Sequence, residues 1–266
     1  MIIDKDFLSD LRRNAYIECT ENYLAHDNVV GIFGDELPEE IFYGCSLIPV
    51  PLEGVDAHIF RFGKQDEGKD LCDVIKSTLI YLTTQKCPIL YSCKTYVTEN
   101  KCPLLYNTLK ENTEKPVIIY ENEKQLKQAL CKIYNTQYSE NKTQKSKNDL
   151  DYIKNILTEI ELYSDLNTEE VFLLTFYSKY MTDLSMRKKY FKSLKQKINF
   201  RNEKKKIQKI SALCPRGNYK SVCSEINSNS ARLYRSWDNS DYGYANCIFN
   251  FKNEKNYEEE NKNASF

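Results

Sequence analysis

The amino-acid sequence predicts an α/β fold with a Rossmann-like parallel-sheet lobe, a helical connector and an abbreviated second α/β lobe. Short apolar runs alternate with helical patterns over the first part of the chain, which is typical of a parallel sheet covered by helices. Helical patterns then follow one another without strands, until the order strand, glycine turn, helix and strand returns near residue 207. The predicted segments are an N-terminal α/β lobe (1–121), a helical connector (122–205), the start of a second α/β lobe (206–248) and a polar tail (249–266).

The N-terminal lobe is expected to begin with a helix over 4–26, because apolar residues recur there at helical spacing and Asp4 or Asp6 can cap its start. Four later apolar runs predict strands, at 29–34, 46–52, 88–92 and 116–120. Helical patterns lie between these strands, at 38–45, about 69–84 and about 95–112.

The connector is expected to be helical. Residues 122–138 form one helical pattern, 139–149 ("SENKTQKSKND") predict a polar linker or exposed turn, and 149–198 predict three more helices. The basic run at 187–206 ("RKKYFKSLKQKINFRNEKKK") is interpreted as a solvated helix face rather than a nucleic-acid patch, because acids elsewhere cancel its charge.

The second lobe is expected to open with a strand at 207–213, a helix at about 218–228 and a strand at 231–236. The tail is polar and highly charged, a composition that predicts disorder.

Charge and hydropathy exclude several classes of protein. The 38 basic and 38 acidic residues cancel, so strong attraction to nucleic acid or to an anionic membrane is not expected. The first residues lack the apolar core of a signal peptide, and no later apolar run approaches the about 18 residues that span a bilayer. We therefore expect a cytoplasmic protein with no membrane partner.

Phosphate-loop and nucleophile motifs are absent. The turn "GIFGDELPEE" lacks the third glycine of a dinucleotide fingerprint and the Lys-Ser/Thr of a P-loop. Its acids are explained as partners of the helix dipole, with Pro38 in the first turn. These acids are Asp35, Glu36, Glu39 and Glu40. With two histidines and no Gly-x-Ser-x-Gly elbow, the sequence offers no nucleophilic triad.

Ten cysteines pose the main functional question, because a reducing cytosol disfavours a disulfide framework. They are Cys19, Cys45, Cys72, Cys87, Cys93, Cys102, Cys131, Cys214, Cys223 and Cys247. No Cys-x-x-Cys pair occurs, so a local zinc site is not expected. Two interpretations stay open: buried thiols, or ligands brought together by the fold. For the second, Cys72 opens a predicted helix, and Cys93 follows the predicted strand "PILYS" at the carboxyl end where such sheets bind ligands.

Three motifs in order resemble the amino-terminal lobe of the 2-hydroxyacyl-CoA dehydratase family, which includes relatives of the 2-hydroxyglutaryl-CoA dehydratase D component and of benzoyl-CoA reductase subunits. They are "VVGIFGDELPEEIFYGCSLIPVPLEG", "LCDVIKSTL" and "CPILYSCKTYVTENKCPLLYNTL". The later "KISALCPRGNYKSVCSEINSNSARLYRSWDNSDYG" is similar to the start of that family's second lobe. The chain therefore looks like a shortened or divergent member.

The resemblance implies a [4Fe–4S] cluster held by cysteines, with one iron open to an acyl-CoA-type substrate. It implies Cys72 and Cys93 as thiolate ligands and Glu40 as a helix-start glutamate near the cluster. The third ligand is open, with three candidates: Cys214, Cys223 and Cys247. Two positions depart from the family, since Lys94 stands where Asp is usual and Ser46 where Gly is usual.

Three functions follow as hypotheses. The first is a cluster-binding subunit of a lyase or related reductase, which receives low-potential electrons from an ATP-dependent activator protein and works with a second dehydratase-like subunit. The second, from another class, is a non-catalytic binding or scaffold protein that lost the cluster. The third is a small-molecule or CoA-binding lobe without metal.

Overall fold

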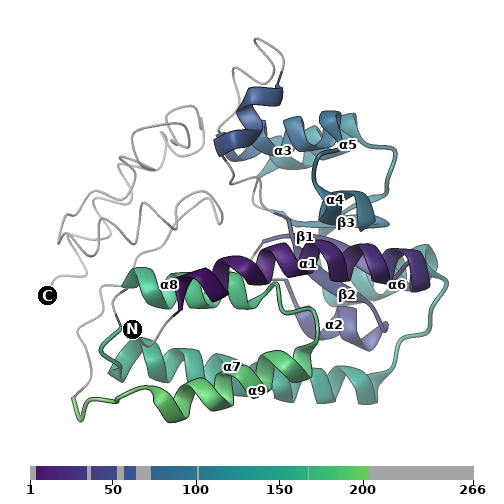
Figure 1. Cartoon of the computed structure of the whole chain (residues 1–266). Helices are drawn as coiled ribbons and strands as arrows, with labels where there is room; N and C mark the ends of the chain where they lie inside the picture. The colour runs from purple at the N-terminus through teal and green to yellow at the C-terminus, as the bar shows by residue number, and fades with distance from the viewer. Residues whose placement is uncertain are drawn as a thin grey trace, which may run out of the picture. The chain divides into compact units, whose positions relative to one another are not determined.

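The computed structural model describes residues 4–34, 37–52, 57–63, 73–100, 102–166 and 168–203 (Figure 1). The chain divides into two compact units, which are described separately. The first comprises Met1–Leu52, Gln85–Asn100 and Thr113–Ile207, and the second comprises Glu53–Thr84, Lys101–Asn112 and Gln208–Phe266. The predicted second lobe and tail (206–266) and Cys72 lie outside the described residues.

A four-stranded, all-parallel sheet forms the centre of the first unit and confirms the predicted α/β class. Its strands are β1 (Val29–Phe33), β2 (Ile48–Pro51), β3 (Thr95–Glu99) and β4 (Val117–Tyr120). They lie in the order β2-β1-β3-β4. Val30 of β1 stands between Pro49 of β2 and Thr95 of β3, and this register fixes which residues share each end of the sheet.

Seven helices of this unit are described: α1 (Lys5–His26), α2 (Glu39–Gly44), α4 (Pro88–Ser92), α6 (Glu123–Tyr134), α7 (Glu140–Tyr163), α8 (Thr168–Ser178) and α9 (Leu184–Lys197). Helix α1 begins as predicted, with the Asp4 carboxylate accepting a hydrogen bond from the Phe7 amide at 3.0 Å. Helices α1 and α4 pack together and both contact β1. Helix α7 packs against α2, α8 and α9, and α7 and α9 run side by side (Figure 1).

The main core lies between the sheet and helices α2 and α6. Alternate strand residues such as Val30, Ile32 and Val97 point to this face and meet Phe42 of α2 and Leu126 of α6. All five side chains are buried, and each contributes about 1.5–3 kcal/mol by its removal from water. The parallel sheet is thus covered as the alternating pattern predicts.

Two expected elements differ in the structure. "PILYS" is the short helix α4 rather than a strand, because the Cys87 thiol accepts a bond from the Leu90 amide at 3.5 Å and Pro88 occupies the first turn. The strand is β3 instead, in the stretch predicted to start a helix at about 95. The helix begins only at Pro103, as α5 (Pro103–Asn112). Short apolar runs do not separate helix from strand by periodicity alone, which explains both errors.

The predicted polar linker at 139–149 is also wrong, since it forms the first turns of α7. Ser139 caps this helix by accepting a bond from the Lys142 amide at 3.4 Å, and Glu140 lies in the first turn. These turns are polar because most of their side chains are exposed, with Ser146 buried.

The second unit contains the 3₁₀ helix η1 (Ala57–Phe62), α3 (Asp73–Thr84) and α5 in its described part, and α3 packs against both of the others. The helix predicted at about 69–84 is confirmed over Asp73–Thr84. Within the described ranges of both units, no helix is long and apolar enough to cross a membrane.

Candidate functional site

The carboxyl edge of the sheet carries the turn that the sequence singles out. In open parallel sheets, ligands bind where consecutive connections leave in opposite directions, and the strand order places that point between β1 and β3. Gly34 follows β1 there with φ +137°, and Glu99 ends β3 with its side chain buried. A Cβ on Gly34 would lie 2.2 Å from the Glu99 Oε1 atom, so the backbone of β1 and this carboxylate approach closely.

Glu40 lies in the first turn of α2 beside Glu39, and Pro38 takes the N-cap position of this helix without a side-chain bond. The two glutamates have different surroundings. Both are partly buried, but Glu39 accepts a hydrogen bond at 2.8 Å from Arg187 of α9. Burial raises the pKa of Glu39, but the nearby Arg187 and Lys179 outweigh burial and hold that pKa below its usual value. Glu39 therefore joins α2 to α9 as a buried carboxylate.

Cys93 lies at the opposite end of the sheet. It follows α4 and precedes β3, and the Lys94 amide bonds to the Val29 carbonyl at 3.1 Å, where β1 begins. The expected place of Cys93, at the carboxyl end of a strand, is therefore wrong, because that strand is a helix. At about 3.3 Å per residue, Cys93 stands roughly 20 Å from Glu99 along the chain. Glu40 and Cys93 thus do not share a pocket.

The surroundings of Cys93 are those of a buried thiol. Its side chain is fully buried, and its Sγ donates a hydrogen bond to the Ile89 carbonyl at 3.0 Å. Burial, reinforced by Cys19, raises the pKa of Cys93 well above its usual value, although Lys115 opposes the shift. A cluster open to substrate at the carboxyl edge does not fit this thiol.

The other proposed ligands lie outside the described residues: Cys72, Cys214, Cys223 and Cys247. Within the described ranges, no group of three or more His, Cys, Asp and Glu side chains is arranged to hold a metal ion. Of the ligands that the resemblance implies, only Cys93 falls within the described residues.

A groove of about 400 Å³ opens among the α2–β2 turn, α7 and the start of α9, all within the first unit. This volume lies in the range of small-molecule sites. Apolar and aromatic side chains line one part of it: Tyr43, Leu47, Ile48 and Leu184. Polar side chains line the rest: Ser46, Lys142, Lys145, Ser146, Asp149, Thr182, Asp183 and Ser185.

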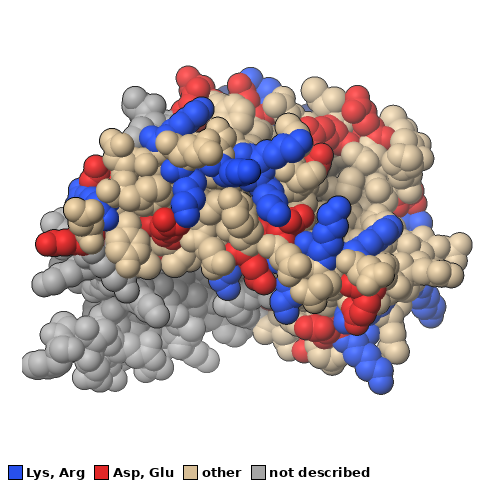
Figure 2. All heavy atoms as spheres, turned by 90° about the horizontal axis from the view of Figure 1, so that it is seen from below, with Lys and Arg blue, Asp and Glu red and all other residues tan. Residues whose placement is uncertain are grey.

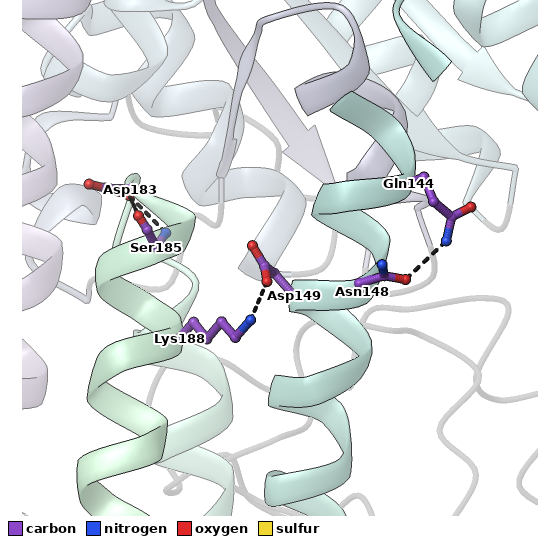
Figure 3. A network of polar contacts seen from close by, with 6 residues as sticks. All are labelled: Gln144, Asn148, Asp149, Asp183, Ser185 and Lys188. Atoms are coloured by element: carbon purple, nitrogen blue, oxygen red, sulfur yellow. Dashed lines mark hydrogen bonds and ion pairs between the residues drawn. The ribbon is translucent and has the colours of Figure 1, made fainter. Parts of the chain in front are cut away.

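The two acids of the groove already have partners (Figure 3). Asp183 caps α9, accepting bonds from the Ser185 amide at 2.8 Å and the Met186 amide at 3.3 Å. Asp149 of α7 accepts a bond from Lys188 of α9 at 2.5 Å, across the gap between the two helices (Figure 3). Both carboxylates are thus engaged by hydrogen-bond donors, which reduces their repulsion of an anion in the groove.

The two lysines of the groove have no acidic partner within the described ranges. Lys142 donates a hydrogen bond to the Ser46 hydroxyl at 2.7 Å, and Lys145 is exposed on the next turn of α7. Ser46 sits in the left-handed region at φ +61° in the turn that leaves α2. The groove therefore combines an apolar part with two cations and several hydroxyl groups.

Part of the basic run at 187–206 is paired with acids, while Lys189, Lys192 and Lys197 are exposed, as expected of a solvated helix face. Its ion pairs are Arg187 with Glu39, Lys188 with Asp149, Lys195 with Glu159 and Arg201 with Asp165. Seen from the side of α7 and α9, Lys and Arg side chains lie beside Asp and Glu over much of the face (Figure 2). These pairs place a counter-charge beside Arg187, Lys188, Lys195 and Arg201.

Sequence reasoning missed Lys142, Lys145 and Arg187. Lys142 and Lys145 fall in the run expected to be a linker, and Arg187 falls in the run expected to be a solvated face. No local motif marks any of them, because each acquires its role from a residue about 100 or more positions earlier. No protein-family model matches this chain, and no curated protein sequence matches it.

Proposed function

We propose that this protein is a non-catalytic binding module of the α/β class that holds a small anionic molecule in the groove between the α2–β2 turn, α7 and α9. The observation that carries the proposal is the pair of lysines, Lys142 and Lys145, over a groove of about 400 Å³ whose own acids are already partnered. A phosphate or carboxylate between the two ammonium groups gains charge-assisted hydrogen bonds.

The apolar part of the groove supports an organic ligand rather than a bare ion. Tyr43, Leu47 and Leu184 can cover a hydrophobic or aromatic portion while the lysines hold its charged end. Burial raises the pKa of Tyr43 to about 12, so its phenol stays protonated and can donate a hydrogen bond.

Calorimetric titration with adenosine monophosphate and with pyrophosphate tests the proposal. Adenosine monophosphate pairs a phosphate with an apolar ring, whereas pyrophosphate offers charge alone, so tighter binding of the first supports a role for the apolar part. Changing Lys142 and Lys145 together to Gln should weaken binding at least tenfold, because two charge-assisted bonds are lost. Lys147→Gln is the matched control, being exposed on the same helix and outside the groove. Binding of neither probe, or equal binding by the double variant, overturns the proposal.

The described thiols support a reducing compartment such as the cytoplasm. Six cysteines form no disulfide bond in the described ranges: Cys19, Cys45, Cys87, Cys93, Cys102 and Cys131. Reduced thiols in this number suit a compartment that keeps thiols reduced. The paired charges of α9 likewise favour a module without a nucleic-acid or membrane partner.

The dehydratase-like function is the second candidate, favoured by the place of the Glu40 turn at the carboxyl edge of the sheet, near the switch point. It would involve a [4Fe–4S] cluster, an ATP-dependent activator or second subunit, and an acyl-CoA-type substrate. Since Cys93 does not fit that edge, such a cluster would need other thiolates.

Anaerobic purification with iron and acid-labile sulfide analysis decides between the two candidates. Absence of iron, even after reconstitution, supports the binding module. Bound iron that survives Cys93→Ala but not Cys72→Ala would favour the second candidate with Cys93 as a buried thiol. Loss of iron in Cys93→Ala would contradict our placement of that residue.

A further inference from the structure

Two cysteines far apart in sequence meet beside the α2–β2 turn. Cys45 is the C-cap residue of α2 and Cys131 lies in the last turn of α6, and their Sγ atoms are 3.8 Å apart. Both residues belong to the first unit. A disulfide bond needs an S–S distance of about 2.05 Å, so the two sulfurs would approach by roughly 1.8 Å. Side-chain rotation with a small shift of α6 can supply such a movement.

Thr136 holds both cysteines in place. Its amide donates a hydrogen bond to the Cys131 carbonyl at 3.1 Å, and its hydroxyl donates one to the Cys45 carbonyl at 3.1 Å. The Cys45 amide is held in turn by the Ile41 and Phe42 carbonyls at 3.1 and 3.0 Å. The two backbones are thus tied together by the same residue, which keeps the thiols close and limits their other orientations.

The two thiols differ in their access to solvent. Cys45 is fully buried within the core formed with α6, whereas Cys131 is partly exposed. Burial, and then the neighbouring Cys131 thiol, raises the pKa of Cys45 to about 12, so it remains a protonated thiol at neutral pH. An oxidant from solvent therefore meets Cys131 first.

We propose that Cys45 and Cys131 are an oxidative cross-linking site, which forms an intramolecular disulfide when the protein meets a peroxide. The Cys131 thiolate attacks one oxygen of hydrogen peroxide, the O–O bond breaks, and the products are a sulfenic acid and one water once the leaving hydroxide takes a proton. The Cys45 sulfur then attacks the sulfenic sulfur, the S–O bond breaks, and its thiol proton leaves with the hydroxide as a second water. Two thiols and one peroxide give one disulfide and two waters, so the two sulfurs together lose the two electrons that the peroxide gains.

The bond would tie the end of α2 to α6 across 86 positions of the chain. Such a cross-link restricts the unfolded chain and stabilises the folded one. It would also fix the turn after Cys45, whose Ser46 and Leu47 line the groove. The cross-link itself does not depend on what the groove binds.

Peptide mapping of the full-length protein tests the inference. Native protein is treated with one equivalent of hydrogen peroxide, its remaining thiols are alkylated, and it is digested without reduction. We expect a linked pair of peptides that contain Cys45 and Cys131, lost on treatment with dithiothreitol, and a melting temperature several degrees above that of the reduced protein. Recovery of both cysteines as alkylated single peptides, or their linkage to other cysteines instead, overturns the inference.

Two variants make the test specific. Cys131→Ser removes the accessible partner and should abolish both the linked peptides and the rise in melting temperature, while its partly exposed position favours normal folding. Cys102→Ser removes another partly exposed thiol and should leave both signals unchanged. A rise in melting temperature that persists in Cys131→Ser would assign the effect to other thiols and contradict the proposed site.

Discussion

Arg187 of α9 donates a hydrogen bond from Nη2 to Oε2 of Glu39 in α2 at 2.8 Å, and only 5% of the Arg187 side chain and 17% of the Glu39 side chain are exposed. These residues are 148 positions apart, and their contact joins the first turn of a core helix to the last described helix. Such a pair depends on both partners, because removing one leaves the other charge largely shielded from water and without its ion-pair partner.

Replacing Arg187 with Met should therefore destabilise the first unit strongly. We expect a loss of about 3–5 kcal/mol in the free energy of unfolding, since the Glu39 carboxylate would stay buried without its partner. Urea unfolding followed by far-UV circular dichroism measures it. Arg201→Met is the control, because its pair with Asp165 is exposed and should contribute less than about 1 kcal/mol. A double change of Arg187 to Met and Glu39 to Gln should recover part of the loss. A stability of Arg187→Met equal to that of the control would contradict this account.

Acid should reveal the same pair through Glu39. Its pKa in the folded protein lies below its usual value, because Arg187 and Lys179 outweigh the effect of burial. The unfolded chain then binds a proton more readily than the folded one, so the stabilisation is complete above the unfolded pKa of about 4.3 and is lost as pH falls through the folded pKa. Stability measured between neutral pH and pH about 3 should fall less steeply in Glu39→Gln than in the wild type. Glu40→Gln, which keeps the pair intact, should retain the steep fall, and equal slopes for the wild type and Glu39→Gln would argue against the shift.

The fold class follows from the sequence, because three of the four strands are apolar runs between helical patterns. The failure at 88–99 has a local cause. The apolar "PILYS" satisfies a strand pattern, but Cys87 and Pro88 start a helical turn, and the more polar Thr95–Glu99 becomes a central strand, buried on both sides. A strand between two other parallel strands is stabilised by burial of both its faces and by hydrogen bonds to its neighbours, and a local sequence pattern does not show these contacts.

The candidate site is less predictable than the fold. The glycine turn after β1 and the acids of α2 are visible in the sequence, yet the partner of Glu39 is not. The groove likewise depends on Ser46 and Lys142, 96 positions apart, which meet because α7 packs on α2. Contacts of this kind follow from tertiary packing, so the sequence predicted a site at the carboxyl edge of the sheet and missed the groove at the α2–β2 turn.

A side chain at Gly34 should destabilise the fold. Its φ of +137° is a region that other residues avoid, and an added Cβ would lie 2.2 Å from Glu99 Oε1. Gly34→Ala should lower the free energy of unfolding by about 2–4 kcal/mol, from backbone strain together with the clash. Glu99→Ala removes the clash but leaves the backbone strain. In a protein that carries Glu99→Ala, Gly34→Ala should therefore lower the free energy of unfolding by less than it does in the wild type, but still lower it. Urea unfolding of the wild type, both single variants and the double variant gives the comparison, and a cost unaffected by Glu99→Ala would show that the clash plays no part.

Lys115 should act as a cap for the end of α4 and the start of β3. Its ammonium group donates hydrogen bonds to three carbonyls, those of Leu90 at 3.2 Å, Tyr91 at 2.6 Å and Cys93 at 2.6 Å. The last carbonyls of a helix lack partners within it, and a cation there also meets the negative end of the helix dipole. Lys115→Met keeps most of the apolar stem and removes these bonds, so we expect a loss of about 2 kcal/mol in the free energy of unfolding.

The effect of Lys115→Met should also be local. The Cys93 thiol, buried beside these carbonyls, should react faster with a thiol reagent under native conditions in Lys115→Met than in the wild type, because α4 would open more often. Lys124→Met is the control, as Lys124 is exposed on α6 and has no hydrogen bond or ion pair within the described ranges. Mass spectrometry of alkylated peptides resolves Cys93 from the other cysteines. Cys19 lies on α1, which packs on α4, so its reactivity with the thiol reagent should rise less than that of Cys93. An equal rise in the reactivity of every buried thiol would indicate global unfolding instead of the loss of a cap.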